Sequence, residues 1–175
     1  MRFGHFVLRP INSDDAHALF DLIDRNRPRL EDFFAGLVSR TRTLDDTRAH
    51  VKDTLAKGDA GTYFAFLLVD TRTGGTAGLV DIKNIDRSIP KAELGAFMDA
   101  AYEGQGLASH ALQAITRHCF DVLGIDKLLI RTHEGNLAAR KVIERNGYQL
   151  EGKVRKDYRT TAGEVVDLLY YGKVR

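Results

Sequence analysis

The chain has 175 residues, the length of one ordinary domain, and its hydrophobic content of 43% can build a core without metal or disulfide cross-links. Its net charge of only +2, with acidic and basic residues interleaved, gives no electrostatic reason to expect a nucleic-acid partner. The single cysteine excludes an internal disulfide, and no apolar run approaches the roughly 20 residues that a membrane span needs.

These properties predict one soluble domain over residues 1–175, without a membrane partner. The first ten residues lack the long apolar stretch and the small-residue cleavage site of a secretory signal. No Pro- or Ser-rich linker divides the chain. A lone thiol also fits a reducing compartment, so we expect a cytoplasmic protein.

The N-terminal part of the chain predicts one strand and two helices. Residues 6–9 form the expected strand. Ser13 is predicted to cap a helix over residues 14–24, whose first-turn carboxylates suit the helix dipole. Thr43 is predicted to cap a second helix over residues 44–57.

The middle of the chain predicts three consecutive strands and a helix. Residues 63–70 are apolar and aromatic, as in a buried strand, and the turn at residues 71–75 makes a hairpin with the next strand. The further strands cover residues 76–85 and 91–98. The helix at residues 105–123 places its apolar residues on one 3.6-residue face.

The C-terminal part predicts a short strand at residues 128–130 and a helix at residues 136–146, with Gly147 in the left-handed position after it. An antiparallel pair at residues 148–158 and 164–171 completes the chain. The order β-α-α-β-β-β-α-β-α-β-β predicts an α+β (mixed α/β) domain, in which helices flank a mixed sheet.

The segment 94–108 is the most informative part of the sequence, because a strand runs into a Gly-x-Gly turn that opens an amphipathic helix. Gly104 and Gly106 allow the backbone to curl closely around an anion, at which the first helical N–H groups point. The spacing matches neither a Rossmann turn nor a Walker A loop. The segment therefore predicts either an anion site or only a tight strand-to-helix connection.

A second motif follows that helix. After the strand at residues 128–130, Asn136 opens the last helix, which ends in Asn146-Gly147-Tyr148. An N-cap would explain Asn136 without a ligand. The order of the two motifs, however, closely resembles motifs A and B of the GNAT acetyltransferases.

The resemblance covers nearly the whole chain. The motif A pattern of the family is Gln/Arg-x-x-Gly-x-Gly/Ala, and this chain has Glu103-x-x-Gly106-x-Ala108, which departs at the first position. Other segments are similar to the RimJ/RimL branch, whose members acetylate the N-termini of ribosomal proteins. These are Leu8-Arg9-Pro10, Asp15-Ala16, Asn84-Ile85-Asp86, Lys91-Ala92-Glu93-Leu94-Gly95 and Leu150-Glu151-Gly152.

The resemblance implies a mostly antiparallel sheet of about seven strands, in which the fourth and fifth strands are splayed apart. It also implies acetyl-coenzyme A as co-substrate, with its pantetheine arm between those strands and its pyrophosphate on the Gly-x-Gly turn. The residues implied in binding it are Phe97, Met98, Gly104, Gln105, Gly106, Leu107, Ala108 and Asn136. No metal is expected, since the six histidines show no paired metal-ligand spacing.

Members of this family let a neutral amine attack the thioester directly, in a ternary complex. Glu93 is the candidate base for that amine, with a solvated strand carboxylate as the alternative. Family members often have a serine that protonates the thiolate where this chain has Ala139. Tyr148 and Tyr158 carry hydroxyls nearby, and Tyr148 is the second catalytic candidate, with packing as the alternative for both. Cys119 is expected in the core.

The resemblance favours the α-amino group of a ribosomal or other protein as the acceptor. A small amine, such as a polyamine, an amino sugar or an amino acid, stays open, as does a module that binds acyl-CoA with little catalysis. Phe33 and Phe34 either line an acceptor groove or pack the loop between the first helices. A homodimer is also left open.

Overall fold

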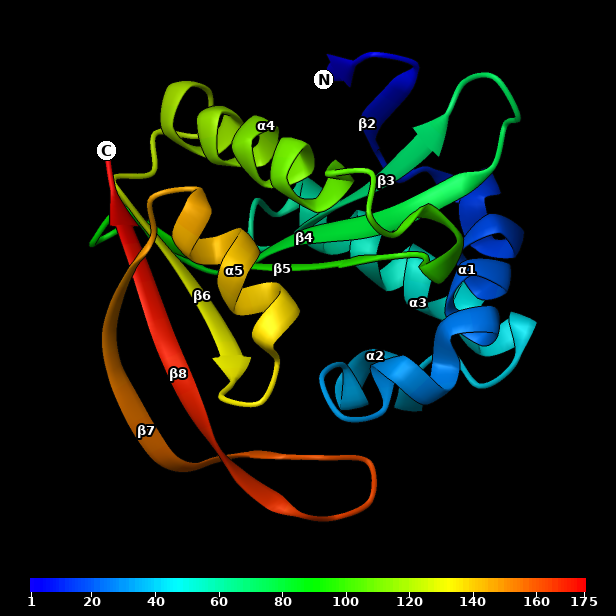
Figure 1. The fold of residues 1–175 in the computed structure, drawn as a ribbon. Coiled ribbons are helices and arrows are strands. Elements are labelled where there is room, and N and C mark those ends of the chain that lie inside the picture. Colours follow the sequence, from blue (N-terminus) through cyan, green and yellow to red (C-terminus); the bar gives the residue numbers. More distant parts are fainter.

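One eight-stranded sheet organises the computed structural model, which describes residues 1–175 (Figure 1). The strand order is β1-β2-β3-β4-β5-β6-β8-β7, and all neighbours are antiparallel except β5 and β6. The predicted α+β class with a mostly antiparallel sheet is confirmed. No helix combines the length and the apolar composition that crossing a bilayer requires.

All of the predicted elements form in the predicted order, with short additions. The strands are β1 (Arg2–Phe3), β2 (Phe6–Pro10), β3 (Phe64–Asp70), β4 (Thr76–Asp86), β5 (Lys91–Met98), β6 (Lys127–His133), β7 (Gln149–Arg159) and β8 (Val165–Val174). The helices are α1 (Ala16–Leu30), α2 (Ala35–Ser39), α3 (Leu44–Asp59), α4 (Leu107–Asp121) and α5 (Leu137–Arg145), with 3-10 turns at Ser13–Asp15 and Ala100–Tyr102. The prediction missed β1, α2 and both 3-10 turns.

The start of the first helical segment differs from the prediction, because Asn12 and not Ser13 is the cap. The Asn12 side chain accepts a hydrogen bond from the Asp14 amide at 2.9 Å, and the Asp15 carboxylate accepts one from the Asn12 amide at 2.7 Å. This reciprocal arrangement satisfies two backbone donors, which a cap at Ser13 would leave unpaired.

The end of α1 also differs, since the helix continues from the predicted end at residue 24 to Leu30 and contains Pro28. Asn26 and Leu30 are buried on one face of this extension. Burial of that face against the rest of the fold stabilises the extra turns and offsets the cost of a proline inside a helix.

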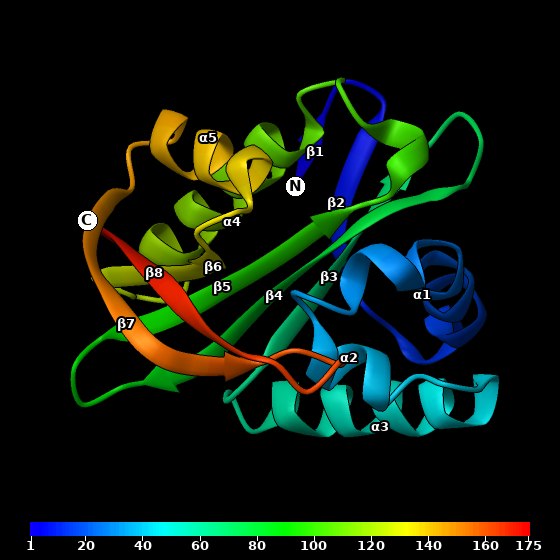
Figure 2. The same ribbon diagram turned by 60° about the horizontal axis from the view of Figure 1, so that its bottom comes forward.

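The helices cover the two faces of the sheet in two groups, α4 and α5 on one face and α1, α2 and α3 on the other (Figure 2). Alternate residues of one strand serve the two resulting cores. Val80 and Ile82 of β4 belong to the core under α4, whereas Leu79 belongs to the core under α1 and α3. Most positions near the middle of the sheet are therefore buried.

The centre of the sheet opens because β5 and β6 separate. They pair in parallel only from Lys91 with Lys127 to Glu93 with Leu129, although β5 continues to Met98 and β6 to His133. These are the fourth and fifth strands of the family pattern, and the predicted splay is confirmed. The facing edges of the two strands are left without a neighbouring strand.

Buried polar contacts tie α1 to the end of β5. Asp99 accepts hydrogen bonds from Arg25 Nε at 2.7 Å and from Asn26 Nδ2 at 3.1 Å, and Asn26 Oδ1 accepts one from the Ala100 amide at 3.0 Å. Burial by itself would raise the pKa of Asp99, but the bonds from Arg25, Asn26 and the Ala101 amide outweigh it and lower that pKa. This network fixes the start of the turn that follows β5.

We expect Asp99→Asn to destabilise the fold at pH 7 by about 1–3 kcal/mol, because Arg25 and Asn26 lose a charged acceptor. The pKa of Asp99 is depressed in the folded state, so its stabilisation is present above the unfolded-state pKa and is lost as the pH falls through the folded-state value. Urea unfolding at pH 7 and near pH 3 should show the difference between wild type and variant shrinking in acid.

The matched control is Asp121→Asn, since Asp121 is exposed and has no side-chain partner. That change should alter the free energy of unfolding by less than about 0.5 kcal/mol. A difference between wild type and Asp99→Asn that is the same at both pH values would contradict the assigned role of the carboxylate.

Candidate functional site

A cleft of about 930 Å³ opens where β5 and β6 separate. It reaches both faces of the sheet, since its walls include Leu107 and Ala108 of α4 on one side and Phe33 and Phe34 of the loop between α1 and α2 on the other. Two ligands can therefore approach from opposite faces and meet beside the point of separation, where Glu93 lies.

The Gly-x-Gly turn presents a row of unpaired backbone donors to this cleft. Gly104 and Gly106 adopt φ values of +75° and +72°, which curl the chain into the start of α4. The successive amides of Gln105, Gly106, Leu107 and Ala108 donate to no protein acceptor. Such a run of N–H groups at a helix N-terminus binds phosphate or another anion, and the geometry favours an anion site over a mere connection.

The β6-facing edge of β5 supplies further unpaired backbone to the cleft. Phe97 and Met98 line it, while their side chains have packing roles. Phe97 packs edge-on against Phe34, with ring centroids 5.4 Å apart. Met98 covers Gly78, where an added Cβ would lie 2.7 Å from the Met98 sulfur. The Phe97 carbonyl faces Gly78 of β4, so a ligand in the gap can bond only those peptide groups of this stretch that face away from β4.

Asn136 caps α5 and lines the cleft at the same time. Its Oδ1 accepts a hydrogen bond from the Ala139 amide at 3.2 Å, whereas its Nδ2 has no protein partner. The N-cap interpretation is confirmed, and the Nδ2 donors stay free of protein partners.

Glu93 lies at the last paired position of β5 and is buried, with only 7% of its surface exposed. Its carboxylate accepts hydrogen bonds from Asn84 Nδ2 at 2.8 Å and from Arg131 Nε at 3.0 Å, and Lys83 Nζ lies 3.6 Å away. The alternative of a solvated strand carboxylate is wrong. Since each carboxylate oxygen has two acceptor positions, Glu93 can still accept a hydrogen bond from a group in the cleft that it lines.

Arg131 and Asp157 complete this polar centre, and sequence reasoning missed both. Arg131 bonds Glu93 on one side and Asp157 on the other, at 3.3 Å, and the Tyr170 hydroxyl donates to Asp157 at 2.7 Å. The register of β7 and β8 shifts between Val154 and Tyr158, so the bulge turns Asp157 inward. The signal was the charged run before Tyr158, which breaks the alternation expected of a strand.

The two tyrosines of this region have different surroundings. Tyr148 is 3% exposed and does not line the cleft, and its hydroxyl bonds Thr116 Oγ1 at 2.7 Å inside the core. Burial raises the pKa of Tyr148. A catalytic role does not fit this position, so we correct the expectation and assign Tyr148 to packing. Tyr158 does line the cleft, and its hydroxyl accepts the Ala35 amide hydrogen bond at 2.7 Å.

The β7–β8 hairpin closes over the loop that follows α1. Thr161 lies in the turn of this hairpin. It donates two hydrogen bonds to the Glu31 carbonyl, from its amide at 3.2 Å and from its hydroxyl at 2.7 Å. Both ribbon views place the end of the hairpin beside α2 (Figures 1 and 2). With the Tyr158 bond to Ala35, these contacts join the hairpin to the loop between α1 and α2, on the face away from α4.

Cys119 lies in the core, as expected, and is fully buried. Burial raises the pKa of its thiol to about 12. Phe33 and Phe34 both line the cleft, and Phe34 also packs in the core under α1. No group of three or more His, Cys, Asp or Glu side chains gathers into a metal-binding cluster.

Comparison with known protein families matches residues 5–149 to the family described as "Acetyltransferase (GNAT) domain". The chain is 31% identical over 174 residues to the "Putative ribosomal N-acetyltransferase YdaF" of Bacillus subtilis, covering 98% of this chain and 92% of the relative. It is 24% identical over 149 residues to the ribosomal-protein-serine acetyltransferase of Escherichia coli, covering 85% and 82%. A spermidine N(1)-acetyltransferase of Escherichia coli matches 49% of this chain and 46% of its own length, with 28% identity.

Solved structures share the fold over nearly the whole chain. The ribosomal-protein-S5-alanine acetyltransferase from Vibrio fischeri superposes with a TM-score of 0.90 at 22% identity, covering 99% of this chain and 95% of that one. RimL, a ribosomal L7/L12 alpha-N-protein acetyltransferase solved with coenzyme A, gives 0.89 at 24% identity, covering 98% and 95%. At these identities the likeness is one of fold.

Proposed function

The chain belongs to the GNAT acetyltransferase family, and we propose that it acetylates the N-terminal α-amino group of a protein, with ribosomal proteins as the acceptor class. The main support for this proposal is the cleft through the sheet. It joins a row of free amides on one face to the buried Glu93 centre on the other. The nearly full-length match to a relative named as a ribosomal N-acetyltransferase supports this acceptor class. We further propose that residues 1–175 act as one catalytic domain in the cytoplasm, where ribosomal proteins are made.

Acetyl-coenzyme A supplies the activated acetyl group, whose thioester carbonyl the amine attacks directly. The amides of residues 105–108 would hold the pyrophosphate, and their unpaired state fits an anion of that size. The exposed β5 edge at Phe97 and Met98 would bond the pantetheine amides, and the free Nδ2 of Asn136 would meet the same arm.

The polar centre favours an α-amino group over a more basic amine. The acceptor must be neutral to attack, and an α-amino group with a pKa near 7.7–8.0 is partly neutral at pH 7, unlike a lysine side chain near 10.4. Glu93 would take the proton that the attacking amine loses. Lys83 and Arg131 flank Glu93, so a polyamine would bring its further positive charges against two fixed cations.

We propose that Tyr158 returns a proton to the departing thiolate, a role that Ala139 cannot fill. Its oxygen accepts the Ala35 amide bond, so its own proton is free to donate into the cleft that it lines. Burial raises the pKa of Tyr158, so the hydroxyl stays protonated at neutral pH.

An acceptor panel tests the proposed function. We expect a peptide with a free N-terminus to show the highest kcat/KM, with mass spectrometry placing the acetyl group on its α-amine. The matched peptide has a blocked N-terminus and one lysine, and spermidine, glucosamine and free amino acids complete the panel. A preference for a small amine would move the assignment to that class, and tight acetyl-CoA binding without turnover would make the protein a binding module.

Glu93→Gln is expected to lower kcat by roughly 10²–10⁴, because the amide cannot accept the amine's proton. KM for acetyl-CoA should change little, since the proposed cofactor contacts are backbone ones. The loss should shrink as the pH rises, because more acceptor is then already neutral. The control Glu151→Gln changes an exposed pair with Lys127 and should leave kcat unaltered. Equal rates for wild type and Glu93→Gln across neutral pH would remove Glu93 as the base.

Tyr158→Phe and Tyr148→Phe form a matched pair that separates proton donation from packing. Tyr158→Phe should lower kcat by about 10²-fold at neutral pH. Tyr148→Phe should lower stability by about 1 kcal/mol, because Thr116 loses its buried partner, and should leave kcat unchanged. Thermal unfolding and steady-state kinetics measure the two effects. Equal kcat values for the two variants would contradict the assignment to Tyr158.

A further inference from the structure

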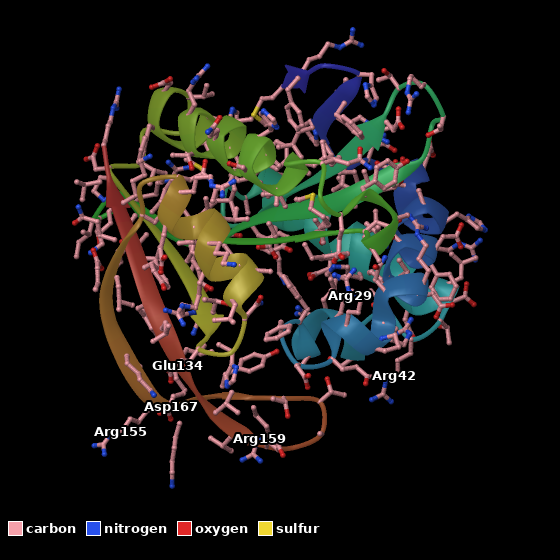
Figure 3. The ribbon with its side chains drawn as sticks, viewed as in Figure 1. Arg29, Arg42, Glu134, Arg155, Arg159 and Asp167 are labelled. Carbon is pink, nitrogen blue, oxygen red and sulfur yellow. The ribbon has the colours of Figure 1, made fainter.

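An ion pair joins the last turn of α1 to the Gly-x-Gly turn. Arg29 Nη2 bonds the Glu103 carboxylate, and Arg29 Nη1 bonds Asn26 Oδ1 at 3.3 Å. Asn26 in turn holds the Ala100 amide. Figure 3 shows Arg29 on the inner side of α1, toward the centre of the molecule, whereas Arg42 points outward.

Glu103 occupies an unfavourable place for a carboxylate in an anion site. It directly precedes Gly104 and the free amides of residues 105–108, and it lines the same cleft. A fixed negative charge beside a bound diphosphate repels it, and the repulsion is strongest at low ionic strength. The side chain that pairs with this carboxylate is Arg29, which also lines the cleft.

We propose that Arg29 sets the affinity of this protein for the diphosphate of its co-substrate by neutralising Glu103. When the ion pair is formed, Arg29 cancels the negative charge of Glu103, and the amide donors of the turn can bind the diphosphate without that repulsion. The ligand class is a nucleotide diphosphate that carries a thioester arm. This inference rests on the proposed use of acetyl-CoA and adds a specific residue to it.

The Arg29–Glu103 pair contributes to diphosphate binding through its charge and adds little to the stability of the fold. Side-chain exposures of 47% for Arg29 and 60% for Glu103 make it a surface ion pair, and such pairs contribute little to folding. Removing Arg29 should therefore leave the melting temperature of the free protein nearly unchanged while it weakens binding. A structural role for Arg29 would move the melting temperature first.

A double-mutant cycle with calorimetric titration of coenzyme A tests the proposal. At low ionic strength Arg29→Met should weaken binding by about tenfold, because it exposes the Glu103 charge to the diphosphate. Arg29→Met combined with Glu103→Gln should bind within about twofold of wild type, because the repulsive charge is also gone. Raising the salt to about 0.5 M should shrink the loss of the single variant.

The control pair is Arg48→Met with and without Asp45→Asn, an exposed ion pair on α3, and neither variant should alter binding. Gly106→Val should lose binding by obstructing the amides, which reports on the site itself. If wild type binds coenzyme A and Arg29→Met binds it equally well, this inference alone is overturned. The same holds if the double variant binds as weakly as Arg29→Met. Absence of coenzyme A binding by wild type would instead overturn the proposed function.

Discussion

The early end of pairing between β5 and β6 is the constraint on which the other functional features depend. After Glu93 and Leu129, the two strands diverge and leave peptide groups unpaired in the middle of a sheet. Such groups need partners, and a ligand with its own amides can supply them. The helices α4 and α5 each follow one of these strands in the chain, and Leu107 and Asn136 at their N-termini both line the cleft. Both helix N-termini therefore lie beside the same opening.

The polar centre occupies the apex of this opening, and its members come from different strands. Glu93 lies on β5, Arg131 on β6 and Asp157 on the bulge of β7. A buried carboxylate is tolerated there because charged donors surround it. The apex is thus polar where the two faces of the sheet communicate, and charged side chains such as Arg29 and Glu103 also line the cleft. That placement agrees with the proposed proton transfer at the point where the two proposed ligands would meet.

Most features set by residues close in sequence could be predicted, although the first helical segment is capped by Asn12 and not by Ser13. Thr43 caps α3 and Asn136 caps α5 as expected, because a cap depends on the next three residues. Features set by distant contacts could not be predicted. The burial of Glu93 and the different surroundings of Tyr148 and Tyr158 depend on which elements pack over each side chain. The alternation of apolar and polar residues within a single strand does not show which elements pack over each side chain.

The longer α1 is the clearest case, because its extra turns depend on distant contacts. Asn26 and Arg29 lie beyond the predicted end at residue 24, and both hold residues that follow β5. The same helix leads directly into Phe33 and Phe34, which line the other side of the cleft. One element therefore positions the turn proposed for the cofactor and the wall proposed for the acceptor. A helix that ended at residue 24 would leave both without support, so the departure from local preference at Pro28 belongs to the site and not to the core alone.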